Sequence, residues 1–375
     1  MSTIPSRPRS QHVSSVRPNA SQETLRESNL ALVAATVLAA TDGMSRAQAA
    51  AATSLTRATV SRLVDDLIGG GILRENGKVA GAPGRPATML GPSDRLCALG
   101  LQVNATFHLA RLVTLDGSTV DEIYTPADLM ASDPTEVLPR LGRDARTLLA
   151  RQVGSDRRIV GAGLALPGIV EPASRTLRRA PNLGWTDVEV APLLGLADVG
   201  LSLLGNEADL AAFSLARPAP GRLGPVTDFV YVSGEIGVGG SAVVAGEVMP
   251  GRHGWAGEIG HMCVDPSGPP CPCGSYGCLE RIAGWRAFED GAGLPHGSSV
   301  SEFLACYDSG HEGAARAVRR AADALETALV SVVNLLDIQT IVVGATSRPW
   351  RVSSCRRWRR GWARGSWRAP STGRT

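Results

Sequence analysis

One histidine and three cysteines lie close together in the second half of the chain, at spacings that suit a metal ion. They are His261, Cys271, Cys273 and Cys278. Three thiolates and one imidazole form a complete tetrahedral ligand set for Zn²⁺ and leave no open position for a catalytic water. Gly274 and Gly277 allow the tight backbone turns that would bring the sulfurs together. The sequence therefore predicts a structural zinc site, and the alternative is a loop of free thiols.

Two carboxylates flank these candidate ligands along the chain, Glu258 on one side and Glu280 on the other. Carboxylate oxygens accept hydrogen bonds from hydroxyl groups, so a pair of them beside a metal-anchored loop suits a sugar or another polyol. Solvated or salt-bridged side chains would have the same spacing. Both interpretations stay open on the residues alone.

The elements around these residues start with a helical segment near the N-terminus. Apolar residues follow a helical period three times, in residues 30–38, 45–52 and 56–68. Three glycines end the third helix, and residues 72–74 form a predicted short strand. The turn residues at 76–77 and 84–86 indicate a hairpin with an extended tip. We therefore expect a winged helix-turn-helix over residues 29–92, preceded by a disordered polar arm over residues 1–28.

The second helix of a helix-turn-helix lies in the major groove of DNA and presents small polar and basic side chains there. The predicted groove-facing residues are Thr56, Arg57, Thr59, Ser61 and Arg62. Ser45 and Arg46, which start the preceding helix, are predicted to contact the DNA backbone, and Arg85 is predicted to enter an adjacent minor groove. The alternative is that Thr56 only caps its helix and the arginines are solvated.

Beyond residue 92, short apolar runs alternate with helical stretches. The predicted strands are residues 96–103, 109–114, 159–166, 199–204, 229–232 and 341–343, and the predicted helices are residues 134–152, 207–216 and 314–336. Alternating strands and helices predict an α/β body.

The composition of the 375-residue chain excludes several classes of protein. Charged residues make up 19% and glycine accounts for 43 residues, which argues against a coiled coil or an acidic disordered chain. The N-terminus lacks an apolar signal-peptide core, and the longest apolar run is too short to span a bilayer. We therefore expect a cytoplasmic protein with no membrane partner, in which clustered cysteines form a metal site or are ordinary core residues.

The formal net charge of +3 is unevenly distributed. From Ser347 onward there are nine arginines and no acidic residue, so the rest of the chain is mildly acidic. An argument for DNA binding must therefore depend on a local cluster. Residues 346–375, an atypical Arg/Trp-rich tail, have two open interpretations: an out-of-frame or truncated end, or a basic arm that binds nucleic acid.

Four stretches of the body resemble the ROK family of bacterial sugar-responsive repressors and sugar kinases. They are residues 161–168 (GAGLALPG), 180–185 (APNLGW), 257–261 (GEIGH) and 271–280 (CPCGSYGCLE). The last stretch matches the zinc signature of the family. Residues 24–75 are similar to the family's repressor branch, of the xylose and N-acetylglucosamine repressor type, which adds a winged helix to a sugar-kinase-like body.

The resemblance implies that the body is a two-lobed, actin-like ATPase fold. The first lobe would comprise residues 93–205, and the second, with the zinc site, residues 206–345. A sugar effector would lie between them, held by Asn206, Glu207, Glu258, His261 and Glu280. His261 would serve zinc and sugar through different ring nitrogens. The family normally continues beyond residue 345, so a non-functional fragment is a third interpretation of the tail.

Two departures from the family's kinases favour a repressor over an enzyme. Those kinases begin the first lobe with an Asp-x-Gly-Gly-Thr loop for phosphate and Mg²⁺, whereas residues 100–106 have the sequence GLQVNAT. The catalytic aspartate is replaced by Glu207, whose longer side chain displaces the carboxylate. Residues 234–240 keep a glycine-rich turn, which is weak evidence for ATP binding.

These observations lead to one expectation and one alternative. We expect a sugar-responsive transcriptional repressor of carbohydrate genes, without catalytic activity, in which homodimers or dimers of dimers bind operator DNA until a sugar closes the cleft. The alternative is an ATP-dependent sugar kinase with an accessory DNA-binding module.

Overall fold

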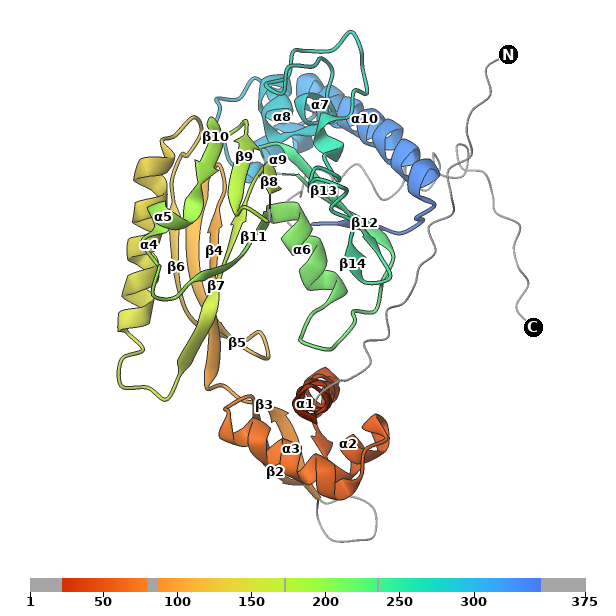
Figure 1. Ribbon diagram of the computed structural model, residues 1–375. Coiled ribbons are helices and arrows are strands. Elements are labelled where there is room, and N and C mark those ends of the chain that lie inside the picture. Colours follow the sequence, from red (N-terminus) through yellow and green to blue (C-terminus); the bar gives the residue numbers. More distant parts are fainter. Residues whose placement is uncertain (1–21, 80–86, 172, 235, 345–375) are drawn as a thin grey trace, which may run out of the picture. The chain divides into compact units, whose positions relative to one another are not determined.

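The computed structural model describes residues 22–79, 87–171, 173–234 and 236–344. The chain divides into two compact units, residues 1–91 and residues 92–375. Figure 1 shows the helices and strands of both units.

The first unit is a winged helix. Its three helices are α1 Gln22–Ala39, α2 Arg46–Thr53 and α3 Arg57–Gly69. Its sheet has the order β1-β3-β2, with β1 Met44–Ser45, β2 Leu73–Val79 and β3 Ala87–Pro92. Val37 of α1, Leu63 of α3 and Leu90 of β3 are buried in one shared apolar core. The predicted winged helix-turn-helix is confirmed.

The first helix begins earlier than the sequence predicts. We expected a disordered arm through residue 28, but α1 starts at Gln22, so the prediction was wrong for residues 22–28. Arg26 in this stretch pairs with Asp66 of α3 at 2.8 Å. Glu23 lies in the first helical turn, where a negative charge interacts favourably with the helix dipole. Such polar contacts leave no apolar period in the sequence. Residues 1–21 and Arg85 lie outside the described residues.

The second unit has two lobes, and the first lobe contains a five-stranded sheet. In the order β11-β7-β4-β5-β6, its strands are β11 Leu201–Asn206, β7 Arg158–Leu166, β4 Leu96–Val103, β5 Phe107–Thr114 and β6 Thr119–Pro126. Helices α4 Pro134–Ala150 and α5 Val190–Leu194 lie along one side of this sheet (Figure 1). Leu101, Leu141 and Leu164 belong to the core between sheet and helices.

A small antiparallel sheet completes the first lobe. Its strands are β8 Ile169–Glu171, β9 Thr176–Ala180 and β10 Trp185–Glu189, in the order β10-β9-β8. Trp185 is 1% exposed, and its indole N–H donates to the carbonyl oxygen of Ser132 at 3.0 Å. This buried anchor fixes the small sheet on the lobe, because an indole donor must find a partner when buried.

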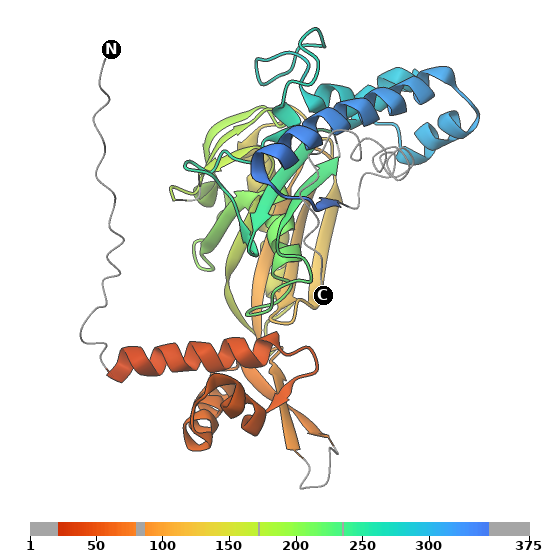
Figure 2. The ribbon, with the colours of Figure 1, turned by 90° about the vertical axis from the view of Figure 1, so that its right-hand side faces the viewer.

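The second lobe contains a four-stranded sheet and most of the remaining helices. Its strands, in the order β14-β13-β12-β15, are β14 Glu247–Val248, β13 Val238–Val244, β12 Phe229–Gly234 and β15 Ile341–Val343. Its helices are α6 Glu207–Ala216, the short 3₁₀ turn Ile259–His261, α7 Leu279–Ala283, α8 Trp285–Ala292, α9 Val300–Asp308 and α10 Glu312–Leu336. The long helix α10 packs on α7 and α8 (Figure 2).

The predicted α/β body is confirmed. Helix α6 has the predicted bounds, and strand β4 does too. The strands of the small sheet and helices α7, α8 and α9 were not predicted, because such short segments carry too little periodicity. Within the described ranges, the structure contains no helix long and apolar enough to cross a bilayer.

Candidate ligand cleft and metal centre

A cleft of about 340 Å³ lies between the two lobes of the second unit. Its volume falls within the range of small-molecule sites in proteins. Gln102, Gly168 and Asn182 line it from the first lobe. The five predicted sugar-binding residues also line it: Asn206, Glu207, Glu258, His261 and Glu280. The fold therefore brings together residues that are up to 74 positions apart in the sequence.

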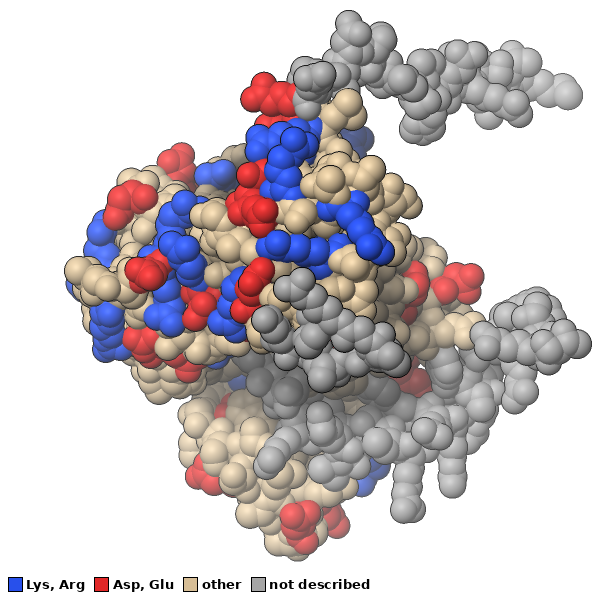
Figure 3. Space-filling view, turned by 90° about the horizontal axis from the view of Figure 1, so that it is seen from below, with Lys and Arg blue, Asp and Glu red and all other residues tan. Residues whose placement is uncertain are grey.

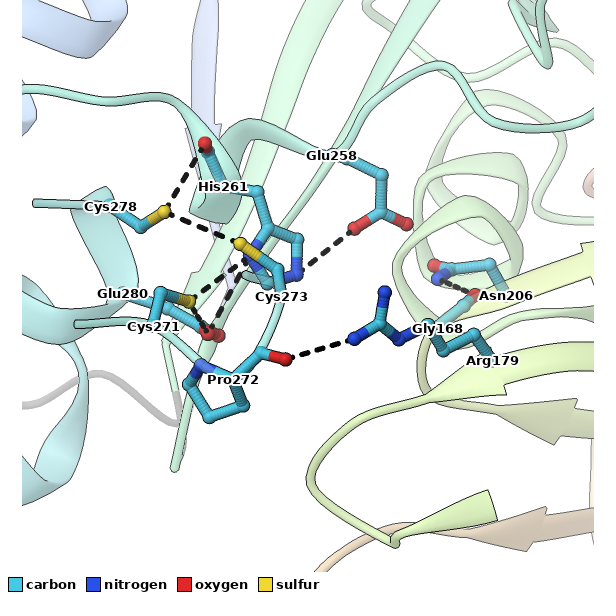
Figure 4. Close-up of polar contacts among 10 residues, drawn as sticks. All are labelled: Gly168, Arg179, Asn206, Glu258, His261, Cys271, Pro272, Cys273, Cys278 and Glu280. Carbon is cyan, nitrogen blue, oxygen red and sulfur yellow. Dashed lines mark hydrogen bonds and ion pairs between the residues drawn. The ribbon is translucent and has the colours of Figure 1, made fainter. Parts of the chain in front are cut away.

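The four predicted zinc ligands converge beside this cleft (Figure 4). Their ligand atoms all lie within 4.8 Å of one another. The Cys271 sulfur is 3.7 Å from His261 Nδ1, and the sulfurs of Cys273 and Cys278 are 3.7 Å apart. Zinc–sulfur bonds of about 2.3 Å at tetrahedral angles would place two sulfurs about 3.8 Å apart. The donor set and its spacing therefore fit a zinc ion.

Two glycines give the metal loop its shape. Gly274 and Gly277 have positive φ angles of 99° and 57°, a region in which only glycine is unstrained. A Cβ atom on Gly277 would collide with the carbonyl oxygen of Asp265. The predicted tight turns are confirmed at both positions.

His261 directs its two ring nitrogens to different partners. Nδ1 faces the Cys271 sulfur and lies 3.6 Å from Glu280 Oε1. Nε2 lies 3.7 Å from Glu258 Oε2 (Figure 4). Nδ1 is therefore the nitrogen that would hold the metal, and Nε2 is directed to a carboxylate of the cleft. This arrangement allows one ring to serve two ligands.

The pKa values of the three candidate cysteine ligands are shifted in different directions. Burial raises the pKa of the Cys271 and Cys278 thiols. Burial acts on Cys273 in the same direction, but hydrogen bonds from the Ser275 backbone and the two other thiols bring the pKa of Cys273 below its ordinary value. Cys273 is thus the thiol that ionises most readily, and the thiolate is the form that binds metal.

The carboxyl group of Glu258 is also perturbed. Burial raises its pKa, the nearby His261 ring opposes this change, and the negative charges of Asp209 and Glu280 add to it. A partly desolvated carboxylate among fixed neighbours is typical of a ligand site.

Asn206 and Glu207 stand where strand β11 of the first lobe passes into helix α6. Asn206 Oδ1 caps the first turn of α6, and its Nδ2 donates to the carbonyl oxygen of Gly168 at 2.8 Å. Glu207 accepts a hydrogen bond of 3.4 Å from Gln102 Nε2. Asn206 therefore fixes the cleft wall, while Glu207 supplies a carboxylate to the cleft.

In the loop after strand β4, the side chain of Asn104 is hydrogen-bonded to Thr106 of the same loop. Asn104, which is 2% exposed, accepts hydrogen bonds from the Thr106 backbone N–H at 2.8 Å and from the Thr106 hydroxyl at 3.0 Å. In a phosphate-binding loop, such backbone N–H groups point at the anion. Here the Thr106 N–H is already paired within the protein.

In the first unit, helix α3 carries basic side chains in its N-terminal half. Arg57 and Arg62 are exposed, and Thr56 caps the helix by accepting the Thr59 N–H at 3.2 Å. Acidic residues Asp65 and Asp66 occupy the C-terminal half. Basic and acidic side chains are interspersed over the face of the molecule seen in Figure 3. Ser61 is half-buried.

Ser45 and Arg46 are engaged within the first unit. Ser45 is 8% exposed and forms a capping box with Gln48 at the start of α2. Arg46 pairs with Asp65 of α3 at 2.9 Å and with Glu75 of β2 at 3.1 Å. These contacts hold α2 against α3 and the wing. Direct contact of either residue with DNA remains a prediction.

Three residues of the site were not identified from the sequence. Gln102 and Asn182 line the cleft, and Arg179 of β9 donates to the carbonyl oxygen of Pro272 in the metal loop. The first two lie within stretches already noted, residues 100–106 and 180–185. Nothing in the sequence points to Arg179, because its partner is a backbone carbonyl 93 residues away.

The fold and the site together define a class of protein: a winged helix joined to a two-lobed, sugar-kinase-like body with one histidine and three cysteines arranged for a metal. The family model described as "ROK family" matches residues 100–347. The chain belongs to the ROK family.

Curated relatives include both repressors and kinases. A putative xylose repressor from Caldicellulosiruptor sp. (strain Rt8B.4) is 33% identical over 248 residues, which cover 65% of this chain and 61% of the relative. A xylose repressor from Caldicellulosiruptor bescii is 32% identical over 270 residues, with 70% and 65% covered. An N-acetylmannosamine kinase from Escherichia coli O157:H7 is 28% identical over 253 residues, with 67% and 83% covered. The chain thus spans less than two thirds of each xylose repressor.

Solved structures show the same fold. A ROK family transcriptional regulator, described as a homologue of the E. coli MLC protein, superposes with a TM-score of 0.72 at 22% identity, covering 92% of this chain and 89% of its own. A ROK hexokinase from Thermus thermophilus superposes with a TM-score of 0.55 at 27% identity, covering 73% and 91%.

Proposed function

We propose that this protein is a DNA-binding transcriptional repressor that responds to a sugar bound in the cleft. The cleft is the observation that carries the proposal. Glu207, Glu258, His261 and Glu280 converge on it, whereas its first-lobe loop has the Thr106 N–H already paired. A site that recognises hydroxyl groups without a phosphate-binding loop suits a sensor. The winged helix in the same chain would convert sugar binding into a change in DNA binding.

Sugar recognition is supported by the acceptors that face the cleft. The side chains of Glu258 and Glu280 are 32% and 10% exposed, so each is partly desolvated but accessible to a ligand. Hydrogen bonds to charged groups contribute about 1.5–3 kcal/mol each. Relatives named as xylose repressor and N-acetylmannosamine kinase are consistent with a sugar as ligand.

The N-terminal half of α3 is the proposed DNA-reading face. Arg57 and Arg62 are exposed there and have the chemistry to pair with guanine edges, while Thr59 and Ser61 suit bases or phosphates. The acidic residues of α3 lie in the half that a helix-turn-helix keeps away from the groove. Recognition by this helix fits a two-fold operator bound by a homodimer or a dimer of dimers.

The proposed switch is a change in the angle between the two lobes when a sugar closes the cleft. That change would alter the spacing of two winged helices in an oligomer, so that they no longer match adjacent major grooves. Moving such an equilibrium from 99:1 to 1:99 requires the effector to favour the released state by roughly 5.5 kcal/mol. Two or three charge-assisted hydrogen bonds made only in that state would be sufficient.

A structural zinc ion is part of the proposal. His261, Cys271, Cys273 and Cys278 would hold it, and when bound it would cross-link the loop without taking part in chemistry. His261 held through Nδ1 would keep its Nε2 beside Glu258. Glu280, next to the metal loop, would keep its carboxylate beside the same ring.

The experiment that tests the proposal is a thermal-shift panel of about twenty neutral and phosphorylated sugars on the zinc-quantified full chain. A ligand at a hundredfold excess over its dissociation constant stabilises the folded state by about 2.7 kcal/mol. The responding sugar is then titrated into a complex with an operator selected from a random duplex library. Release of the operator is expected. Sugar binding that leaves operator affinity unchanged would contradict the switch, and a complete lack of response would contradict the sensor.

An ATP-dependent sugar kinase is the second candidate function. Two observations favour it: Glu207 and the glycine-rich turn around Gly237 both line the cleft, and kinases are among the relatives. Sugar-dependent ADP release is measured in a coupled assay. Release that disappears in Glu207→Gln would establish the kinase and overturn the assignment as a pure repressor.

A further inference from the structure

A smaller pocket of about 90 Å³ shares part of its lining with the cleft, including Glu280. We call it the arginine pocket, and its lining residues are Met130, Pro181, Asn182, Ile236, Pro272, Glu280, Arg281, Arg286, Ala287 and Asp290. Four of these, Pro181, Asn182, Ile236 and Glu280, also line the cleft. The two spaces are therefore adjacent.

Two of the shared lining residues, Glu280 and Asn182, lie over Gly237, which lines the cleft. A Cβ atom at Gly237 would be 2.7 Å from Glu280 Oε2 and 3.2 Å from Asn182 Nδ2. The carboxylate of Glu280 and the amide of Asn182 thus meet above a residue with no side chain. Glu280 from the second lobe and Asn182 from the first lobe line both spaces, so a ligand that occupies both would contact both lobes.

Two arginines line the arginine pocket without ion-pair partners in the described part of the chain. Arg281 is half-buried, its Nε is inaccessible to solvent, and this donor has no hydrogen-bond partner among the described residues. Arg286 is also half-buried and lies in the first turn of helix α8, which begins at Trp285. A buried donor without a partner is unfavourable, so the geometry favours an acceptor from outside the described residues.

The two acidic residues of the pocket are engaged elsewhere. Glu280 Oε1 lies 3.6 Å from His261 Nδ1 and 3.2 Å from the Cys271 sulfur, so this carboxylate faces the metal loop. Asp290 pairs with His296 at 2.9 Å, and its side chain is 66% exposed. The guanidinium groups are therefore the groups in this pocket whose charge has no partner within the described chain.

We propose that the arginine pocket binds an anionic substituent, a phosphate or a carboxylate, on the sugar that occupies the cleft. This inference rests on the proposed function and specifies its effector as an acidic sugar. A guanidinium group presents paired N–H donors that match the oxygens of either anion. The neutral ring would lie against Glu258 and His261, and the anion would lie past Glu280 against Arg281 and Arg286.

The test compares neutral and acidic forms of the same sugars by calorimetric titration of the zinc-loaded full chain. The probes are glucose, glucose 6-phosphate and glucuronate, then xylose and N-acetylmannosamine with their phosphates, and inorganic phosphate alone. The expected result is that one acidic sugar binds at least about tenfold more tightly than its neutral form, with a preference that weakens as salt increases. Comparison of the phosphorylated sugars with glucuronate shows whether the pocket binds a phosphate or a carboxylate.

Arg281→Gln and Arg286→Gln test whether these two side chains bind the anion. Each is expected to remove most of the preference for the acidic form and to leave binding of the neutral form within about twofold. Arg281→Lys keeps the charge but loses the paired donors, so it should retain part of the preference. Arg319→Gln, at an exposed position on α10, is the matched control and should change neither. Zinc content and melting temperature confirm that each variant is folded.

The outcomes separate this inference from the proposed function. Neutral and acidic forms that bind equally, or a preference unaffected by both glutamine variants, would overturn the arginine pocket and leave a sugar-responsive repressor in place. No binding of any sugar in either form would overturn both proposals. Inorganic phosphate that binds as tightly as the acidic sugar would show an anion site independent of the cleft, and would also overturn the inference.

Discussion

Arg179 of strand β9 donates a hydrogen bond of 2.9 Å to the carbonyl oxygen of Pro272 (Figure 4). Pro272 lies between two of the candidate zinc ligands, Cys271 and Cys273, so this contact connects the small sheet of the first lobe to the metal loop of the second. A ligand that changes the angle between the lobes would change this distance.

Arg179→Ala is expected to weaken binding of the responding sugar by about fivefold, because a charge-assisted hydrogen bond at an exposed position contributes about 1 kcal/mol. Zinc content should stay at one ion per chain. Titration calorimetry and metal analysis measure the two effects. The control is Arg178→Ala, since the neighbouring Arg178 pairs with Glu171 and Asp187 inside the first lobe. Equal effects of both variants would contradict a role for the contact between lobes.

Cys273→Ser is expected to reduce bound zinc well below one ion per chain and to lower the melting temperature. Loss of a structural metal belongs to the most destabilising class of changes, and each kcal/mol corresponds to about 2–4 °C for a domain of this size. Metal analysis and calorimetry provide the measurement. Cys263→Ser, an exposed cysteine near the site, is the control. A zinc-loaded Cys273→Ser protein would refute the ligand assignment.

Glu258→Gln should weaken the response to the effector by about 10–100-fold, since it replaces a charged acceptor worth about 1.5–3 kcal/mol with a neutral one. The concentration of sugar needed to release half of the bound operator is the readout. Operator affinity without sugar should stay the same. Glu189→Gln, at an exposed position outside the cleft, provides the comparison. A variant that responds like the wild type would remove Glu258 from the site.

Arg57→Ala and Arg46→Ala are expected to act in different ways. Arg57 is exposed on α3, and its removal should weaken operator binding by about tenfold without changing the melting temperature. Arg46 holds Asp65 and Glu75, so its removal should destabilise the winged helix by about 1 kcal/mol. Fluorescence anisotropy measures operator binding by each variant, and thermal melts measure the stability of each variant. The reverse pattern would assign the DNA contact to Arg46.

Asp209→Asn is expected to stabilise the protein increasingly as the pH rises. Burial raises the pKa of Asp209 above its ordinary value of 3.8, so the folded state binds its proton more tightly and loses stability as pH rises through that window. Asparagine cannot ionise, and it also removes a negative charge near Glu258. The difference in melting temperature between variant and wild type should grow above pH 3.8 and then level off. A constant or shrinking difference would contradict this.

Patterns that are local in the chain predicted much of the fold. The apolar period of residues 56–68 is enough for helix α3, and Asn206 beside Glu207 marks the cap and start of α6. The three cysteines lie within one loop, so their convergence needs only tight glycine turns, and the sequence contains those glycines. The start of α1 escaped prediction because Arg26 and Asp66 stabilise it across 40 residues rather than through an apolar stripe.

The amino-acid sequence was enough to predict the family, the α/β body with its winged helix, and the chemical types of the candidate ligands. The partners of those side chains became clear only from the packing of the folded chain. His261 Nδ1 faces the metal loop, the Asn104 side chain accepts a hydrogen bond from the Thr106 N–H, and Arg281 lines a second pocket. These facts depend on contacts between elements far apart in the chain. Spacing specifies which residues share an element, but packing determines where their side chains point and how far they are desolvated.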